Sequence, residues 1–144
     1  MKTVLSALGV AAVLAFAPTA AFAQGDAKKG ERAFKRCAAC HKVGPKARNG
    51  VGPMLNDLIG RKAGTVEKYK YSKLNLAAGE AGLEWTEENL MVYLVDPSKF
   101  LKEYLKANGA ADKAKGRSKM VFKLRKEDDR QNVIAYLKTF TATN

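Results

Sequence analysis

Five consecutive residues, Cys37-Ala38-Ala39-Cys40-His41, constrain what this chain can fold into more than any other feature. They form the Cys-x-x-Cys-His pattern of c-type haem attachment. Two thiols one helical turn apart can add to the two vinyl groups of one haem, and the adjacent imidazole then lies under the ring, where it can bind the iron. The chain has only two cysteines and one histidine. The pattern predicts one haem c, attached through Cys37 and Cys40, with His41 as an axial iron ligand.

A disulfide and a zinc site are the two other uses of such a cysteine pair. A thioredoxin-like disulfide motif lies beside a βαβ pattern, whereas strand signals are weak throughout this sequence. An exported protein can still close a structural disulfide between Cys37 and Cys40. A zinc site needs four ligands, and no further Cys or His is present to complete one. Haem attachment is therefore favoured, with a disulfide as the alternative.

The first 23 residues have the layout of a secretory signal peptide. Lys2 gives a positive start, an apolar run extends from Val4 to Ala17, and Ala21-Phe22-Ala23 is a small-x-small cleavage site. The apolar run is shorter than the about 20 residues that a membrane-spanning helix needs. We expect residues 1–23 to be a signal peptide cleaved after Ala23, residues 24–144 to form one domain, and this domain to lie in the periplasm. The alternative is an uncleaved segment that anchors the protein to the membrane.

Basic residues outnumber acidic ones, with 26 Lys and Arg against 14 Asp and Glu and a formal net charge of +12. Such a charge accelerates association with acidic partners and makes the association rate salt-dependent. Nucleic acid is another possible partner of a basic chain, but the sequence has no basic run interleaved with aromatic residues. We therefore expect acidic protein partners and no nucleic acid.

Helical patterns alternate with long irregular segments, which predicts an all-α domain. Four segments carry helical periodicity or capping residues, namely 26–38, 86–96 (ended by Pro97), 99–105 and a last segment from about 127. Residues 44–64 are rich in Gly and Pro and are expected to be loop, with at most one helical turn. Residues 108–119 are also expected to be loop. Loops of this length need something to organise them, and a large apolar cofactor would supply the missing core.

The second axial ligand of the iron cannot be another histidine, because His41 is the only one. Methionine is a common partner and raises the reduction potential. The candidates beyond the first 23 residues are Met54, Met91 and Met120. Met91 falls in a helical pattern, where core packing is favoured, and Met54 follows His41 so closely that the opposite haem face is hard to reach. Met120 ends a polar loop that can fold over that face, and it is the favoured ligand of the three.

Further motifs follow in order along residues 25–139, namely Gly52-Pro53-Met54-Leu55, Gly60-Arg61-Lys62-Ala63-Gly64, Tyr71, Trp85, Leu90-Met91-Val92-Tyr93-Leu94, Asp96-Pro97, Ser118-Lys119-Met120-Val121-Phe122 and Ile134-Ala135-Tyr136-Leu137. Together with the haem motif they resemble a class I c-type cytochrome of the cytochrome c2 branch, which is similar to mitochondrial cytochrome c. The resemblance implies the small cytochrome c fold, with three to five helices and long loops around one haem c. Met54 departs from the family, which usually has Asn there, and the segment from Phe100 to Met120 is longer than in mitochondrial relatives.

The resemblance also implies roles for single residues. Met120 would be the distal iron ligand, and the Pro53 carbonyl would accept the free ring N–H of His41. Tyr93 would lie beside the Met120 sulfur. The terminal helices would cross where Gly30 and Phe34 meet Tyr136 and Leu137. The haem propionates, which are costly to bury without donors, would be hydrogen-bonded by Arg61, Tyr71, Trp85 and Ser118.

The expected function is one-electron outer-sphere transfer by a soluble, monomeric carrier that is not an enzyme. The family suggests a cytochrome bc complex as donor and a photosynthetic reaction centre or a terminal oxidase as acceptor, with peripheral docking to these membrane complexes. Lysines around the exposed haem edge would make the contact, and the candidates are Lys35, Lys42, Lys99, Lys119 and Lys123. The alternative is an open-site haem enzyme or a gas-binding cytochrome, which requires that Met120 does not bind the iron.

Overall fold

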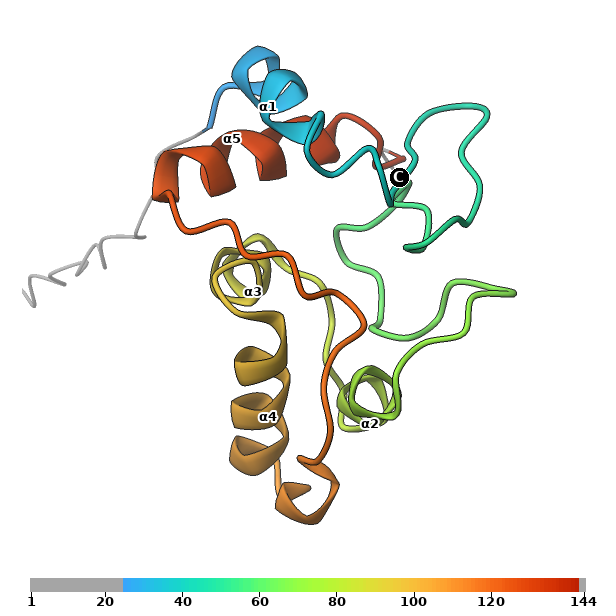
Figure 1. Cartoon of the computed structure of the whole chain (residues 1–144), viewed down its shortest axis with the longest axis vertical. Coiled ribbons are helices and arrows are strands. Elements are labelled where there is room, and N and C mark those ends of the chain that lie inside the picture. The colour runs from blue at the N-terminus through green and yellow to red at the C-terminus, as the bar shows by residue number, and fades with distance from the viewer. Residues whose placement is uncertain (1–24, 143–144) are drawn as a thin grey trace, which may run out of the picture.

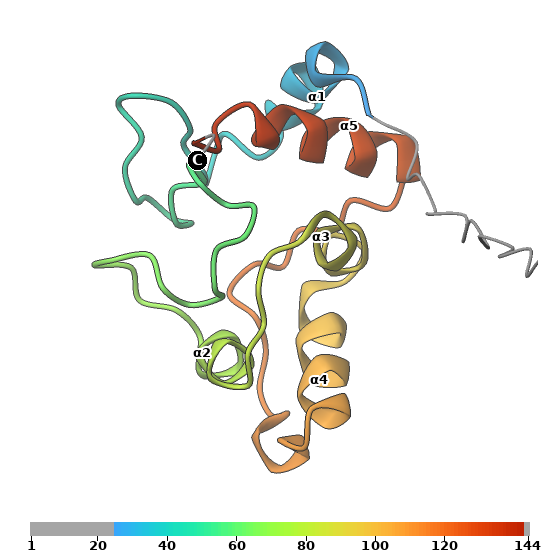
Figure 2. The same cartoon turned by 180° about the vertical axis from the view of Figure 1, so that it is seen from behind.

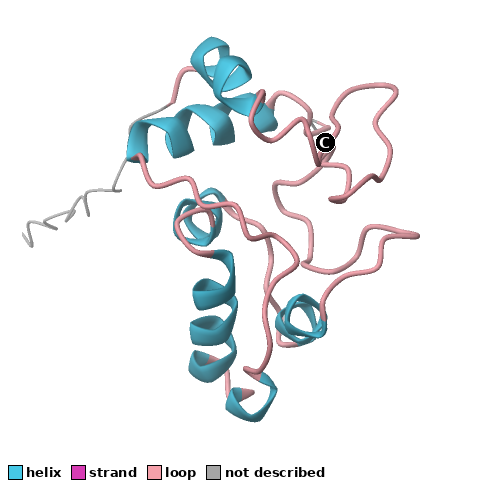
Figure 3. Ribbon diagram, in the orientation of Figure 1, coloured by secondary structure: helices cyan, strands magenta, loops and turns pink. Residues whose placement is uncertain are grey.

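The computed structural model describes residues 25–142, so the expected signal peptide and its cleavage site lie outside the described residues. Within this range the chain forms helices and loops, and its only strand-like pairing is an isolated bridge between Lys62 and Glu84 (Figure 3). The helices are α1 (Ala27–Phe34), α2 (Lys73–Glu80), α3 (Glu87–Tyr93), α4 (Pro97–Ala107), a short 3₁₀ helix η1 (Ala111–Lys113) and α5 (Glu127–Lys138). The predicted all-α class is confirmed.

Side-chain caps set where four of these helices begin, and three of them, α1, α3 and α4, frame the break in the middle of the chain and its first helix. The Asp26 carboxylate accepts hydrogen bonds from the backbone N–H groups of Lys28 and Lys29 at the start of α1. Thr86 caps α3 by accepting a hydrogen bond from the Asn89 N–H. Asp96 caps α4, and Pro97 occupies the first position of α4. Proline suits this position because a backbone N–H there would have no partner within the helix. The break between α3 and α4 therefore follows directly from local sequence.

The first helix is shorter than the sequence pattern predicts. It ends at Phe34, and residues 35–40 continue as hydrogen-bonded turns. The backbone N–H of Cys37 donates to the Phe34 carbonyl, and the N–H of His41 donates to the Cys37 carbonyl. The predicted helical segment 26–38 is thus a helix followed by tighter turns, which carry the cysteine motif away from the helix axis.

The two terminal helices cross, as predicted. A Cβ atom added to Gly30 of α1 would lie 2.0 Å from the Asn132 carbonyl oxygen of α5. The rings of Phe34 and Tyr136 pack beside this contact, with centroids 5.4 Å apart. Figures 1 and 2 show α1 lying across α5 from both sides. The crossing fixes the position of the turns that follow α1.

Helix α2 is absent from the sequence-based prediction. Ser72 caps it by accepting a hydrogen bond from the Asn75 N–H. Five of its eight residues are buried, so it shows little of the alternation between apolar and polar faces that marks a surface helix. Gly79 permits close packing, because a Cβ atom there would lie 2.0 Å from the Ala63 carbonyl oxygen.

Helices α3 and α4 and the segment between η1 and α5 lie on one side of the α1/α5 pair (Figures 1 and 2). In both views α3 lies between the α1/α5 pair and α4, and the segment that joins η1 to α5 runs between α2 and α4 (Figures 1 and 2). The largest side chains with almost no exposure are Leu74, Leu83, Leu101, Leu105, Val133 and Pro97. No helix among residues 25–142 has the length and apolar character needed to span a bilayer.

Candidate haem-binding site

A cavity opens between α3, α5 and the loops, with about 830 Å³ of empty space when its solvent-facing part is included. Nine of the ten predicted site residues line it, namely Cys37, His41, Pro53, Arg61, Tyr71, Trp85, Tyr93, Ser118 and Met120. The tenth, Cys40, is half-buried beside the cavity. Most of the other walls are apolar and come from Phe34, Leu55, Leu58, Leu90, Leu94, Val133 and Leu137.

The two cysteines are presented one turn apart. The Cys40 N–H donates to the Cys37 carbonyl at 3.0 Å and the His41 N–H donates to the same carbonyl at 2.9 Å. Both thiols are free, so Cys37 and Cys40 do not form the disulfide that was the alternative. Burial raises the pKa of the Cys37 thiol. A helical turn that presents two thiols and one imidazole is what thioether attachment of a haem requires.

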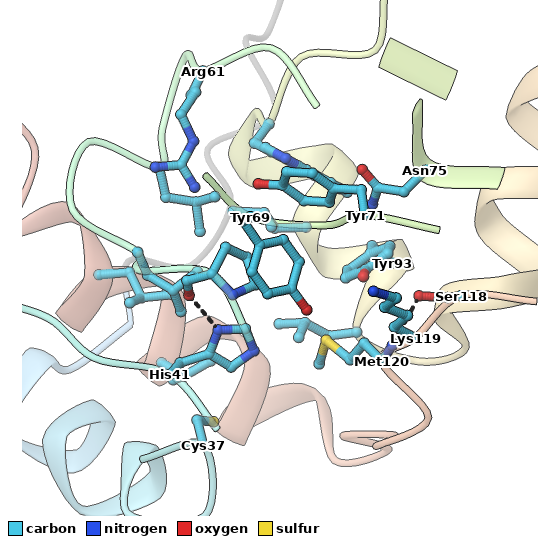
Figure 4. A pocket seen from close by; sticks show the side chains of 18 of the residues that line it. Cys37, His41, Arg61, Tyr69, Tyr71, Asn75, Tyr93, Ser118, Lys119 and Met120 are labelled. Carbon is cyan, nitrogen blue, oxygen red and sulfur yellow. Dashed lines mark hydrogen bonds between the residues drawn. The ribbon is translucent and has the colours of Figure 1, made fainter. Parts of the chain in front are cut away.

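His41 is held in one tautomer by its neighbour. Its Nδ1 lies 2.7 Å from the Pro53 carbonyl oxygen, so Nδ1 carries the proton and Nε2 is free to bind a metal (Figure 4). Burial lowers the pKa of the imidazole, against an opposing effect of the Pro53 hydrogen bond. The neutral ring, which is the form that ligates iron, is therefore favoured at physiological pH.

Met120 lines the cavity on the side away from His41, and its sulfur faces the imidazole in Figure 4. Its backbone N–H donates to the Ser118 hydroxyl at 3.1 Å. Met54 and Met91 do not line the cavity; Met91 packs against the core. Among the three predicted candidates, the structure brings only Met120 to the described cavity.

One end of the cavity is polar. Arg61 donates to the carbonyls of Asn56 at 2.7 Å and Met54 at 3.3 Å, which orients its guanidinium at the cavity wall. Burial lowers its pKa from the usual value and raises that of the neighbouring Tyr71. Asn75 is 6% exposed and lines the same wall (Figure 4). Its Oδ1 has no partner among the described residues. A buried amide left unsatisfied in a cavity wall suits a polar group of a bound cofactor.

The sequence analysis did not identify four polar residues that line the cavity, namely Tyr69, Ser72, Asn75 and Lys119. Ser72 and Asn75 belong to the start of α2, and the N-cap pattern of that helix is the signal that would have located them. Tyr69 donates to the Val51 carbonyl at 2.7 Å. Lys119, predicted only as a docking lysine, donates to the Lys70 carbonyl and lies 5.6 Å from the centroid of the Tyr69 ring. These contacts join three loops at the rim of the cavity.

The residues present fit a haem c. The apolar walls match a flat macrocycle, the Cys37 thiol lies at one wall, and an imidazole and a thioether face each other across the space. Arg61 and Tyr71 lie at one end, where carboxylate side groups of a haem need donors. Burial also raises the pKa of Tyr93 to about 12, so its hydroxyl stays neutral.

Comparison with known proteins agrees with this geometry. The family model for cytochrome c matches residues 27–141. Cytochrome c2 iso-1 of Rhodospirillum centenum is 55% identical over 117 residues, which cover 81% of this chain and 98% of that protein. A cytochrome c2 of Rhodopseudomonas palustris is 54% identical over 114 residues, which cover 79% and 97%. The solved structure of cytochrome c2 from Rhodospirillum centenum matches with a TM-score of 0.81 at 55% identity and covers 82% of this chain and 100% of that one. The chain therefore belongs to the cytochrome c family of electron carriers, which hold one covalently attached haem c.

Proposed function

We propose that this protein is a soluble periplasmic carrier that takes single electrons from a cytochrome bc complex and delivers them to a photosynthetic reaction centre or a terminal oxidase. Residues 1–23 are removed as a signal peptide, and residues 24–144 carry the haem. The observation that carries the proposal is the placement of His41 and Met120 on opposite sides of one apolar cavity. With both axial positions taken, no site is left for a substrate or a gas, which favours a carrier over an open-site enzyme.

Each residue of the site has a task in this function. Cys37 and Cys40 would hold a haem, His41 and Met120 would be the ligands of its iron, and that iron would supply the one-electron redox centre. The Pro53 carbonyl keeps the His41 proton on Nδ1, so His41 presents the same nitrogen, Nε2, to the iron in both oxidation states. The apolar side chains exclude water, while Arg61, Tyr71, Trp85 and Ser118 donate to the propionates.

The proposed docking face is the rim of this cavity. All five lysines predicted to dock are exposed, namely Lys35, Lys42, Lys99, Lys119 and Lys123. Lys42 follows the proximal ligand directly, and Lys119 precedes the distal ligand directly and lines the cavity. Positive charge beside the route of the electron attracts acidic partners at long range and leaves the bound complex short-lived. The protein thus acts as a monomer that docks peripherally on membrane complexes.

The test is the oxidation of the reduced holoprotein by membranes that contain reaction centres or oxidase, followed over a range of salt concentrations. The second-order rate should fall steeply as salt screens the lysines. N-terminal sequencing of the protein released from the periplasm should begin at Gln24. A rate that does not change with salt would exclude docking by charge, and a protein that keeps residues 1–23 would exclude the soluble form.

A further inference from the structure

We propose that Ser98, on α4, is a positioning residue that holds the Met120 ligand in place through a relay of hydrogen bonds. The inference rests on the proposed role of Met120 as an iron ligand. Ser98 does not line the cavity, so it acts only through the residues between.

The relay has two hydrogen bonds. The Ser98 hydroxyl oxygen accepts from the backbone N–H of Ser118 at 2.9 Å. The Ser118 hydroxyl oxygen then accepts from the backbone N–H of Met120 at 3.1 Å (Figure 4). Ser118 is only 5% exposed, so both hydrogen bonds are shielded from water. The backbone of the ligand loop is thus tied at the residue before Lys119 and again at Met120 itself.

The start of α4 is a firm support for this relay. The Asp96 carboxylate caps the helix and Pro97 opens it, so the position of Ser98 is fixed by the helix start. Leu101 and Leu105 of the same helix are fully buried. A hydroxyl in the first turn of such a helix is displaced only if the packing of α4 changes.

The connection along the chain is held less firmly, by the packing of Ala110 and Ala114 against the core and by an exposed ion pair between Lys113 and Glu80. Ser98 and Ser118 are 20 residues apart in sequence, and residues 106–109, 111–113 and 115–117 between them are exposed. The Ser98–Ser118 hydrogen bond bypasses this exposed connection. The segment between α4 and the ligand loop is longer than in mitochondrial relatives, and this hydrogen bond keeps Met120 in place despite that length.

Removal of the Ser98 hydroxyl leaves the Ser118 N–H buried with no acceptor, which destabilises the closed loop but not the opened loop, where water satisfies that group. The fraction of molecules with Met120 released from the iron therefore rises. An external ligand such as imidazole binds the ferric iron only after Met120 has left, so its apparent affinity reports this fraction.

The experiment measures imidazole binding to the ferric holoprotein through loss of the far-red methionine–iron band. In Ser98→Ala the apparent affinity for imidazole should rise by about tenfold, which corresponds to one typical hydrogen bond. Ser98→Thr retains a hydroxyl and should restore the affinity to within about threefold of wild type. The matched control is Thr86→Ala, which removes a hydroxyl that accepts the Asn89 N–H at the start of α3, away from the ligand loop.

Four outcomes are distinguishable. Raised affinity in Ser98→Ala alone supports the positioning role. Unchanged affinity in Ser98→Ala, whatever its stability to denaturant, overturns it, as does an equal rise in Thr86→Ala, because the effect would then follow general destabilisation. If the wild-type protein itself lacks the far-red band, Met120 is not the ligand; the proposed function then fails at that step, and the positioning role falls with it.

Discussion

A Cβ atom at position 52 would lie 2.4 Å from the Cε1 atom of His41. Gly52 is therefore the residue that allows the imidazole to lie against the loop and donate to the Pro53 carbonyl. Gly52→Ala should lower the free energy of unfolding of the holoprotein by about 2 kcal/mol, because either the ring or the loop has to shift. Guanidinium denaturation followed by haem absorbance measures this change.

The matched control for this substitution lies two residues away. A Cβ atom at Gly50 would meet the Cys40 carbonyl oxygen at 3.4 Å, which is an ordinary contact. Gly50→Ala should therefore change the free energy of unfolding by less than about 1 kcal/mol. Equal effects of the two substitutions would mean that the contact with His41 is not what requires glycine at position 52.

The starts of α1 and α3 could be predicted from local sequence and the terminal crossing from the family resemblance, whereas α2 could not; α4 was expected over 99–105 and begins two residues earlier, at Pro97. Thr86 and Pro97 act within one turn of themselves, and the apolar face of α5 repeats at helical spacing. Helix α2 has only eight residues, five of them buried, so its helical form depends on packing against Ala63 and its neighbours, and not on an amphipathic pattern.

The candidate site shows the same division. The haem motif and the resemblance located nine of the residues that line the cavity. Asn75 was missed because it belongs to the unpredicted helix. The contact of Lys119 with the Lys70 carbonyl joins residues 49 positions apart, and no spacing in the sequence indicates which distant carbonyl a lysine will reach.

The choice of the distal ligand can be tested by removing each methionine in turn. Met120→Ala should lose the far-red methionine–iron band and bind carbon monoxide in the ferrous state, because the second axial position is then open. Met54→Ala and Met91→Ala should keep the band, since neither side chain lines the cavity. Visible spectra of the three holoproteins make the comparison. Retention of the band in Met120→Ala would assign the ligand to another residue.

Asp96 should contribute to the acid sensitivity of the fold. Its Oδ2 lies 2.5 Å from the Lys123 ammonium beyond the ligand loop, and its Oδ1 accepts the Lys99 N–H. Two hydrogen bonds hold the pKa of Asp96 below its ordinary value of 3.8. The one from the Lys123 ammonium has the larger effect, and the one from the Lys99 backbone N–H has the smaller effect. The folded protein thus binds this proton less readily than the unfolded chain does. The resulting stability is present above the unfolded pKa and is lost as pH falls through the folded pKa.

Asp96→Asn should remove this part of the pH dependence while keeping a residue that can cap α4. Urea titrations from about pH 5 to about pH 3 should show a smaller loss of unfolding free energy in the variant than in the wild type. Lys123→Gln, which removes only one of the two partners, should fall between them. Superimposable pH profiles for Asp96→Asn and the wild type would contradict the assignment.

Reversing the charge of single lysines distinguishes docking at one face from attraction by the net charge of the whole protein. Lys42→Glu and Lys119→Glu should each slow oxidation by partner membranes several-fold at low salt, with the difference vanishing at high salt. Lys115→Glu changes the net charge equally but lies in the exposed segment after η1, and it should slow the reaction much less. Equal slowing by all three would indicate that net charge alone controls association.

The most direct test of the whole account is the visible spectrum of the wild-type holoprotein, oxidised and reduced, with and without carbon monoxide. Ligation by His41 and Met120 predicts a low-spin spectrum with the far-red methionine–iron band and no change on addition of carbon monoxide near neutral pH. A high-spin spectrum that shifts with carbon monoxide would show an open iron site and would contradict the electron-carrier account.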